Sequence, residues 1–348
     1  MAKRIPSYVG LELEPSAVHA ASVTVNGTLS IKSAALAPLE AGVVRDGEVT
    51  DVAALSEVLR TMWAENKDLP KRVRIGIANQ KIVVRVIELP PIDDPKQLEA
   101  AVRFQASDEI PMPLDAAVLD FRALDVVDTP NGPRQRVVLV AARRDMVDSV
   151  LLAARNAGLR VEGIDLAAFA MVRALAGTDG AALEDTVLYL SVGGLTNLAV
   201  AQGTDCTFTR VVGGGIEALA VELAERRGLT LEHARGWLDH VGLDTPLEEI
   251  DGEELILEEA RTVLLDGVRR IAGEVRNTVD FHLSQSSQGR GATRCVLTGA
   301  AASVPGFAAA LGRDLALPVV VGTVDGAPEA LGAQRFSVAA GLAVEAAV

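Results

Sequence analysis

The chain has 348 residues and a formal net charge of −14, from 33 Lys and Arg against 47 Asp and Glu. Hydrophobic residues make up 49% of it and aromatic residues only 3%, so Ala, Val and Leu must fill the cores of a folded protein. An acidic chain without clustered Lys and Arg is unsuited to phosphate backbones, which excludes a nucleic-acid binder. Cys206 and Cys295 are too few for a disulfide framework or a Cys-based zinc site.

A weak internal repeat is the first organising feature. Residues 8–23 predict a strand, a small turn and a second strand, and a third strand follows near residues 28–37. Residues 187–201 repeat this strand–turn–strand pattern in the second half of the chain. The repeat favours two related α/β domains that face each other, and two unrelated hairpins are the alternative.

Apolar spacing predicts the elements that lie between these hairpins, in chain order a helix over 51–66 and strands over 72–78 and 81–89. Asp94 followed by Pro95 is typical of a helix start, and this helix is expected to end near residue 109, before Pro111 and Pro113. The next elements expected are strands over 118–127 and 136–142 and a helix over 145–157.

The second half is expected to be mainly helical after the glycine run at 213–215, with helices over 216–227, 231–240 and 252–283. Its last predicted elements are a strand over 295–299, a helix from residue 305, a strand over 318–324 and a closing helix over 334–346. No apolar stretch reaches the ~20 residues that a membrane span needs, and the basic first residues lead into no signal-peptide core. The sequence therefore predicts a cytoplasmic protein.

The run from Arg103 to Asp120, with Ile110-Pro111-Met112-Pro113-Leu114 at its centre, resembles the corresponding segment of the PilM family of type IV pilus assembly proteins. Further segments resemble the family in the same order, at residues 9–18, 187–200, 210–216, 296–306 and 336–343. The glycine turns among them are unspecific, but the central motif and the order of the segments are specific. The resemblance covers nearly the whole chain.

This resemblance implies an actin/hexokinase-type, ribonuclease H-like fold of two α/β lobes, with an α/β insert like that of the cell-division protein FtsA. The expected domains are a first lobe at 1–81 with 161–183, the insert at 82–160, and a second lobe at 184–348 with a helical subdomain at 216–285. The family also implies ATP with Mg²⁺ in the cleft between the lobes.

The partners implied by the family are the N-terminal cytoplasmic tail of a PilN-like membrane protein, bound near the insert, and the motor ATPases of the pilus. A homo-oligomer is also compatible with the family. The chain would then lie at the inner face of the cytoplasmic membrane. Its last residues, 341–348, contain no Lys or Arg, so we expect no direct membrane insertion and no amphipathic tether like that of FtsA.

The first hairpin departs from the family pattern Gly-Ile-Asp-Ile-Gly-Ser-x-Ser-Val-Lys. Glu12 stands in place of the Asp that positions Mg²⁺, His19 replaces the Lys, and Ser16 is kept. Glu14 replaces a glycine and adds a carboxylate where phosphate is expected, while Pro15 removes a backbone N–H donor. A carboxylate ~4 Å from a phosphate group weakens the binding free energy of that phosphate by on the order of 1 to 4 kcal/mol.

The second hairpin has Ser191 where the family has another Asp. The glycine-rich turns still predict a nucleotide cleft, whose residues by analogy are Glu12, Ser16, His19, Gly193, Gly194, Thr196, Gly214, Gly215 and Gly299. Because the metal and phosphate groups are altered together, we expect weakened or lost ATP binding and no hydrolysis. The sequence assigns no catalytic and no metal-binding residue.

The specific motif supplies the candidates for the partner groove, namely Arg103, Phe104, Gln105, Ile110, Pro111, Pro113 and Leu114. The alternative is that Phe104, Ile110 and Leu114 form the core of the insert, since apolar residues at helical spacing usually do. The polar residues Arg103 and Gln105 are the stronger functional candidates.

Three functions compete at this point. The nucleotide cleft has altered metal and phosphate groups, whereas the motif of the insert is intact. This combination favours a scaffold that binds a membrane protein's tail. The double hairpin would also suit an active actin-like ATPase or sugar kinase, which the missing second Asp opposes. A cell-division tether like FtsA is disfavoured because residues 341–348 contain no Lys or Arg.

Overall fold

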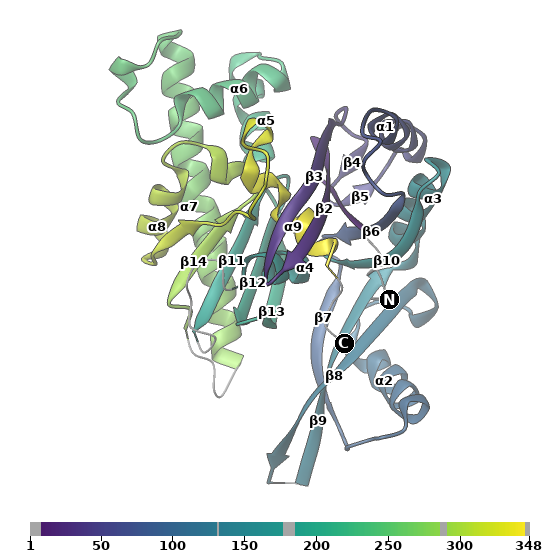
Figure 1. Cartoon of the computed structure of the whole chain (residues 1–348). Helices are drawn as coiled ribbons and strands as arrows, with labels where there is room; N and C mark the ends of the chain where they lie inside the picture. The colour runs from purple at the N-terminus through teal and green to yellow at the C-terminus, as the bar shows by residue number, and fades with distance from the viewer. Residues whose placement is uncertain (1–7, 131, 177–184, 286–290, 345–348) are drawn as a thin grey trace. The chain divides into compact units, whose positions relative to one another are not determined.

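The computed structural model describes residues 8–130, 132–176, 185–285 and 291–344 (Figure 1). It divides into two compact units, a larger one at 1–78 with 154–348 and a smaller one at 79–153. The three predicted domain ranges remain predictions. Residues 177–183, at the end of the predicted first lobe, and residue 184, the first of the predicted second lobe, lie outside the described residues.

The first sheet of the larger unit is built on the N-terminal hairpin. Its strand order is β10 (Arg160–Leu166), β6 (Arg72–Ile77), β1 (Val9–Leu13), β2 (Ala17–Asn26) and β3 (Thr28–Pro38). Strands β1 to β3 pair antiparallel, whereas β6 runs parallel to both β1 and β10. Short strands β4 (Val44–Arg45) and β5 (Glu48–Val49) precede helix α1 (Val52–Glu65), which begins at the N-cap Asp51.

The second sheet repeats this arrangement. Its strand order is β13 (Asp205–Val212), β12 (Thr196–Gln202), β11 (Thr186–Val192), β14 (Arg294–Thr298) and β15 (Val319–Val321). Strands β11 to β13 pair antiparallel, and β14 runs parallel to both β11 and β15. Equivalent hairpins therefore open two related halves, as the internal repeat predicted.

Two short helices, α4 (Ala167–Leu175) and α9 (Ser337–Leu342), lie between the two sheets (Figure 1). They share one hydrophobic core with Ile31 of the first sheet and Tyr189 of the second. Their backbones approach so closely that a Cβ atom on Gly341 would overlap the carbonyl oxygen of Ala170. The packing of α4 on α9 therefore requires glycine at position 341.

The remaining helices of the larger unit cover the second sheet. They are α5 (Ile216–Arg227), α6 (Leu231–Val241), α7 (Glu254–Gln285) and α8 (Phe307–Leu315). Their apolar faces share a core with β11, β12 and β14, and single helical turns lie at Leu247–Glu249, Ala300–Ser303, Glu329–Leu331 and Ala333–Phe336. Among the helices described, none combines the length and the apolar character needed to cross a membrane.

The smaller unit is an antiparallel sheet in the order β7 (Val83–Leu89), β9 (Gly132–Arg143) and β8 (Ala117–Thr129), with helix α2 (Pro95–Glu109). The side chain of Asp94 caps α2 by accepting hydrogen bonds from the backbone N–H groups of Lys96 and Gln97. Leu98, Val102 and Ala106 of α2 belong to one core with the sheet. A helical turn at Leu114–Ala116 precedes β8, and α3 (Arg144–Asn156) follows β9.

Some elements differ from those expected. Helix α4 was not predicted because it is a short, mainly apolar run of nine residues, and periodicity alone does not separate such a run from a buried strand. Strand β10 was missed because a register shift beside Gly163 breaks its alternation. The predicted strand over 318–324 is only Val319–Val321. The predicted closing helix is a helical turn followed by α9, and residues 345 and 346 lie outside the described residues.

We expect Gly341→Ala to lower the free energy of unfolding by about 3 kcal/mol, because the new methyl group must push α9 away from α4. Gly236→Ala is the matched control, because Gly236 lies in α6 with nothing within 4 Å of its would-be Cβ, and it should gain about 1 kcal/mol of helix propensity. Chemical denaturation followed by circular dichroism measures both. Equal effects of the two substitutions would contradict the assigned helix contact.

Candidate functional site

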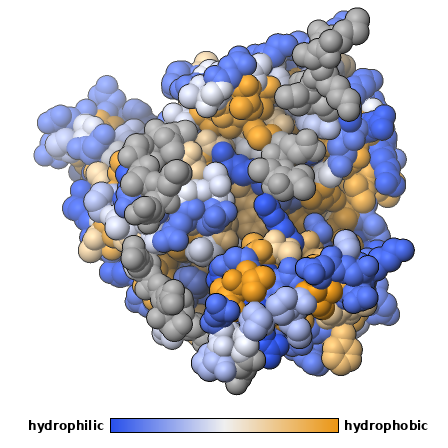
Figure 2. All heavy atoms as spheres, turned by 60° about the horizontal axis from the view of Figure 1, so that its bottom comes forward, coloured by the Kyte–Doolittle hydropathy of each residue, from blue (hydrophilic) through white to orange (hydrophobic). Residues whose placement is uncertain are grey.

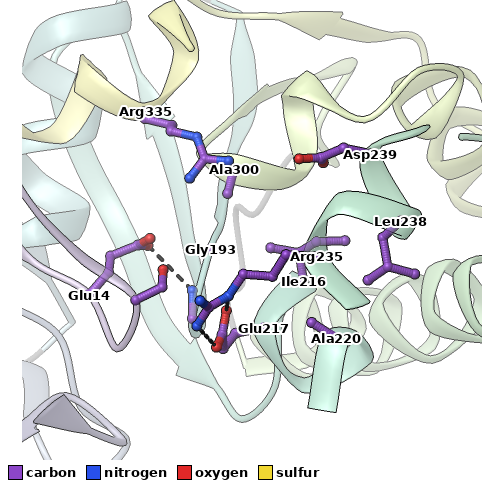
Figure 3. Close-up of a pocket in the computed structure, with 12 residues that line it drawn as sticks. Glu14, Gly193, Ile216, Glu217, Ala220, Arg235, Leu238, Asp239, Ala300 and Arg335 are labelled. Atoms are coloured by element: carbon purple, nitrogen blue, oxygen red, sulfur yellow. Dashed lines mark hydrogen bonds and ion pairs between the residues drawn. The ribbon is translucent and has the colours of Figure 1, made fainter. Parts of the chain in front are cut away.

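A cleft in the larger unit gathers residues that are far apart in the sequence (Figure 3). Its lining residues are Glu14, Ser16, Gly193, Gly194, Ile216, Glu217, Ala220, Arg235, Leu238, Asp239, Ala300 and Arg335. The space between them has a volume of about 40 Å³. Since one water needs ~10–15 Å³, the cleft in this conformation has room for about three waters.

The turns of the two hairpins contact each other inside this cleft. The backbone N–H of Glu14 closes its own turn by donating to the Ala17 carbonyl oxygen at 2.9 Å. The carboxylate of Glu14 accepts a hydrogen bond from the backbone N–H of Gly194, at 3.4 Å between Oε1 and N (Figure 3). A Cβ atom on Gly193 would overlap this carboxylate, and one on Gly194 would overlap the ring of Pro15. Gly194 is therefore needed for the turns to meet, whereas a side chain at position 193 would first have to displace the flexible end of Glu14.

Glu12 and His19 lie behind this contact as cross-strand partners of β1 and β2. Both are buried, with His19 Nδ1 3.7 Å from Glu12 Oε2. Neither ring nitrogen of His19 has a hydrogen-bond partner among the described residues, and the ring meets Phe336 edge-on. Burial raises the pKa of Glu12 to about 8 and lowers the pKa of His19 to about 4. At neutral pH both side chains are therefore largely uncharged.

Charged side chains from other elements surround Glu14. Burial, with the nearby Glu12, raises the pKa of Glu14 to about 7, although His19, Arg335 and the Gly194 N–H act in the opposite direction. The Arg235 guanidinium forms an ion pair with Glu217, donating from Nε to Oε2 at 2.9 Å. Burial also raises the pKa of Asp239, which Arg335 partly offsets. Arg335 is thus a cation of the cleft whose field acts on several acidic groups.

The structure places three of the predicted nucleotide residues on the cleft lining, namely Ser16, Gly193 and Gly194. Glu12 and His19 lie behind it, and the Thr196 hydroxyl donates instead to the carbonyl oxygen of Gly214, at 2.8 Å. Gly215 packs against the Gly193 carbonyl group. Gly299 has a φ of +84° and donates its N–H to the Gln334 carbonyl oxygen at 3.2 Å. Gly215 and Gly299 thus determine the conformation of the turns in which they lie.

Sequence reasoning missed Arg335, Glu217 and Asp239 as cleft residues. Arg335 comes directly before Phe336, which starts a segment that resembles the family, so its position offered a signal. Glu217 lies on α5 and Asp239 on α6. Within the described ranges, no group of three or more His, Cys, Asp or Glu side chains is arranged to hold a metal ion.

The candidate partner residues of the smaller unit differ in burial. Ile110 belongs to the core of that unit, whereas the side chain of Phe104 on α2 is 77% exposed. Arg103 is exposed and pairs with Glu99 of the same helix, at 3.1 Å between Nε and Oε1. Gln105 is half-buried, and Pro111, Pro113 and Leu114 are exposed. The structure thus assigns Ile110 to the core but leaves Phe104 and Leu114 at the surface.

Apolar groups on the surface are spread out. On the face in Figure 2, hydrophobic residues occur in several groups that hydrophilic residues separate. An interface on such a surface combines a few apolar anchors with a polar rim.

Comparison with known proteins places this fold. A structure of ethanolamine utilization protein EutJ from Carboxydothermus hydrogenoformans is 16% identical, with a TM-score of 0.57, over 99% of this chain and 91% of that one. A structure of MreB5 of Spiroplasma citri bound to ADP is 13% identical, with a TM-score of 0.51, over 97% and 95% of the two chains. The chain therefore has the predicted actin-like, two-lobed α/β fold.

Two further comparisons indicate a family within this class of actin-like folds. A structure described as the PilM–PilN type IV pilus biogenesis complex is 25% identical, with a TM-score of 0.80, over 98% of both chains. The sequence profile of the family described as type IV pilus assembly protein PilM matches residues 10–327. The chain belongs to the PilM family, which confirms the resemblance found in the sequence.

The buried carboxyl of Glu12 makes a pH-dependent prediction. Its pKa in the fold is about 8 against an ordinary 4.5, so its contribution to stability is full below pH 4.5 and is lost as the pH rises through 8. His19 acts in the opposite sense, and its contribution is lost only as the pH falls from 6.5 toward 4. Between pH 6.5 and 8 Glu12 therefore makes the largest contribution, and Glu14, with a pKa of about 7, adds a smaller one in the same direction.

We expect the free energy of unfolding to fall by about 2 kcal/mol from pH 6.5 to 8, and Glu12→Gln to remove most of that fall. Denaturant titrations across this range measure it. Glu40→Gln, at an exposed position, is the control and should keep the wild-type slope. A slope unchanged in Glu12→Gln would show that Glu12 is not the titrating group.

Proposed function

We propose that this chain is a scaffold of the type IV pilus assembly platform and binds the N-terminal cytoplasmic tail of a PilN-like membrane protein. One observation carries the proposal: the chain matches a structure described as a PilM–PilN complex over 98% of its length, with a TM-score of 0.80. Membership of the PilM family supports the same role.

We place the tail site on the smaller unit, at the exposed residues of its specific motif. Burying a Phe side chain is worth about 1.5–3 kcal/mol, so a Phe104 that is 77% exposed leaves binding energy for a partner. Arg103 on the same exposed side of α2 adds a cation that can pair with carboxylate or carbonyl groups of a peptide. Gln105, Pro111, Pro113 and Leu114 would extend this surface, with Ile110 supporting it from the core.

The charge of the chain supports recruitment by a protein partner. Anionic membrane surfaces attract basic segments, and a chain with a net charge of −14 gains nothing from such attraction. Binding of the tail would bring the scaffold to the inner face of the membrane, where it could link the platform to the motor ATPases. Self-association into a homo-oligomer would be compatible with this role.

The nucleotide cleft has a structural role in this proposal. The fold implies Mg–ATP, but the residues present do not fit it, because the Glu14 carboxylate already lies on a backbone N–H of the second hairpin. Glu12 and His19, which replace the family's metal-positioning Asp and its Lys, are buried behind the cleft and largely uncharged at neutral pH. We therefore propose a scaffold that does not hydrolyse ATP.

We expect Phe104→Ala to weaken binding of the tail at least tenfold, because truncating a central aromatic anchor typically costs more than 1.4 kcal/mol. The double substitution Arg103→Ala with Gln105→Ala should also weaken it. Calorimetric titration with a synthetic peptide of the N-terminal cytoplasmic tail of the PilN-like protein from the same organism measures both.

Phe281→Ala is the matched control, since Phe281 is 60% exposed on α7 of the larger unit and should leave peptide binding unchanged. Thermal unfolding checks that each variant is folded. A folded wild-type protein that binds no tail peptide would refute the scaffold proposal, and equal effects of the two Phe substitutions would refute the site.

A further inference from the structure

We infer that Glu14 is an internal ligand of the cleft: its carboxylate takes the backbone N–H of Gly194 in place of a nucleotide phosphate, and Arg335 supplies the cationic side of the site. This inference rests on the proposal that the cleft is structural, and it says what stabilises the cleft instead of a nucleotide.

The first step is the shape of the contact. The Glu14 side chain reaches from the first hairpin to the turn of the second, and it fills the space that a Cβ on Gly193 would need. Pro15 does the same above Gly194. A phosphate group could approach this turn only after both side chains had moved away, so the two ligands are mutually exclusive.

The second step is charge. A carboxylate removed from water needs donors and a cation, and here the Gly194 N–H and Arg335 both favour its ionised form. The groups that face it from the packed elements are Glu12 and His19 behind it, Asp239 and Arg235 of α6, and Glu217 of α5. Arg235 is already paired with Glu217 (Figure 3), so of the two arginines that line the cleft we assign Arg335 as the cation whose field favours the ionised form of Glu14.

The third step is the consequence for the two lobes. Glu14 follows β1 of the first sheet and Gly194 follows β11 of the second, so their hydrogen bond joins the two halves directly. In actin-like proteins a bound nucleotide makes this connection between the hairpins. In this chain the Glu14 side chain makes a connection between the same two hairpins through its hydrogen bond to Gly194.

The test compares the wild type, Glu14→Gly, Glu14→Gln and the exposed control Glu40→Gly by hydrogen–deuterium exchange of the peptide that carries Gly194. In Glu14→Gly we expect exchange at this turn to rise at least tenfold. Glu14→Gln keeps an oxygen acceptor and should stay protected, as should the control. Unchanged exchange in Glu14→Gly would overturn the inference.

Mg–ATP binding, measured by calorimetry, gives a second readout. We expect binding to Glu14→Gly to be at least tenfold tighter than to the wild type and Mg–ATP to restore protection of the turn. Wild-type protein that binds Mg–ATP as tightly as Glu14→Gly overturns the inference. Should Glu14→Gly fail to fold, Glu14→Ser serves in the same comparisons.

Titration with the tail peptide separates the two proposals. Glu14→Gly should bind the peptide like the wild type, because Glu14 lies in the larger unit and the proposed tail site in the smaller one. A wild type that binds no peptide refutes the scaffold proposal while the exchange result stands. A wild type that binds both the peptide and Mg–ATP refutes only the internal ligand.

Discussion

The backbone-close packing of α4 on α9 is the constraint on which the rest of the larger unit depends. Gly341 lets α9 reach the Ala170 carbonyl group, and Gly10 lets β1 reach α9 on its other side. Where the two helices meet, their facing residues are mainly Ala and Gly, and the larger side chains of this core, Tyr189 and Phe336 among them, lie in its other parts.

The position of α9 also determines the geometry of the cleft. Arg335 lies two residues before α9, and Phe336, between them, packs against the ring of His19. The same helix contacts β1 and β2, the strands that carry Glu12, Glu14 and His19 toward the second hairpin. Packing, buried charge and the contact between the hairpins are thus linked, and a shift of α9 would alter all of them together.

The sequence predicted most of what depends on local pattern. The repeated hairpins, the start of α2 at Asp94 and the bounds of α5 follow from alternation, capping and helical spacing. It could not predict α4, because periodicity alone does not decide the type of a short, mainly apolar run. The family-like segment that starts at Phe336 was the only signal for Arg335, and it does not show that tertiary packing brings this side chain to the cleft. Phe104 and Ile110 have the same apolar character in one motif, and only the path of α2 and its sheet shows that one is exposed and the other buried.

Two of the acidic residues of the chain, Glu12 and Glu14, are buried in the hairpin region and affect the stability of the fold. Two buried carboxyl groups with raised pKa values destabilise the fold at neutral pH, so glutamine would be better at either position for stability alone. At Glu14 this cost is offset by a contact that connects the two halves. A nucleotide-driven protein takes the free energy of lobe closure from its ligand. If the cleft is structural, as proposed, a side chain that connects the two hairpins would make the conformation independent of ATP concentration, as a permanent scaffold would require.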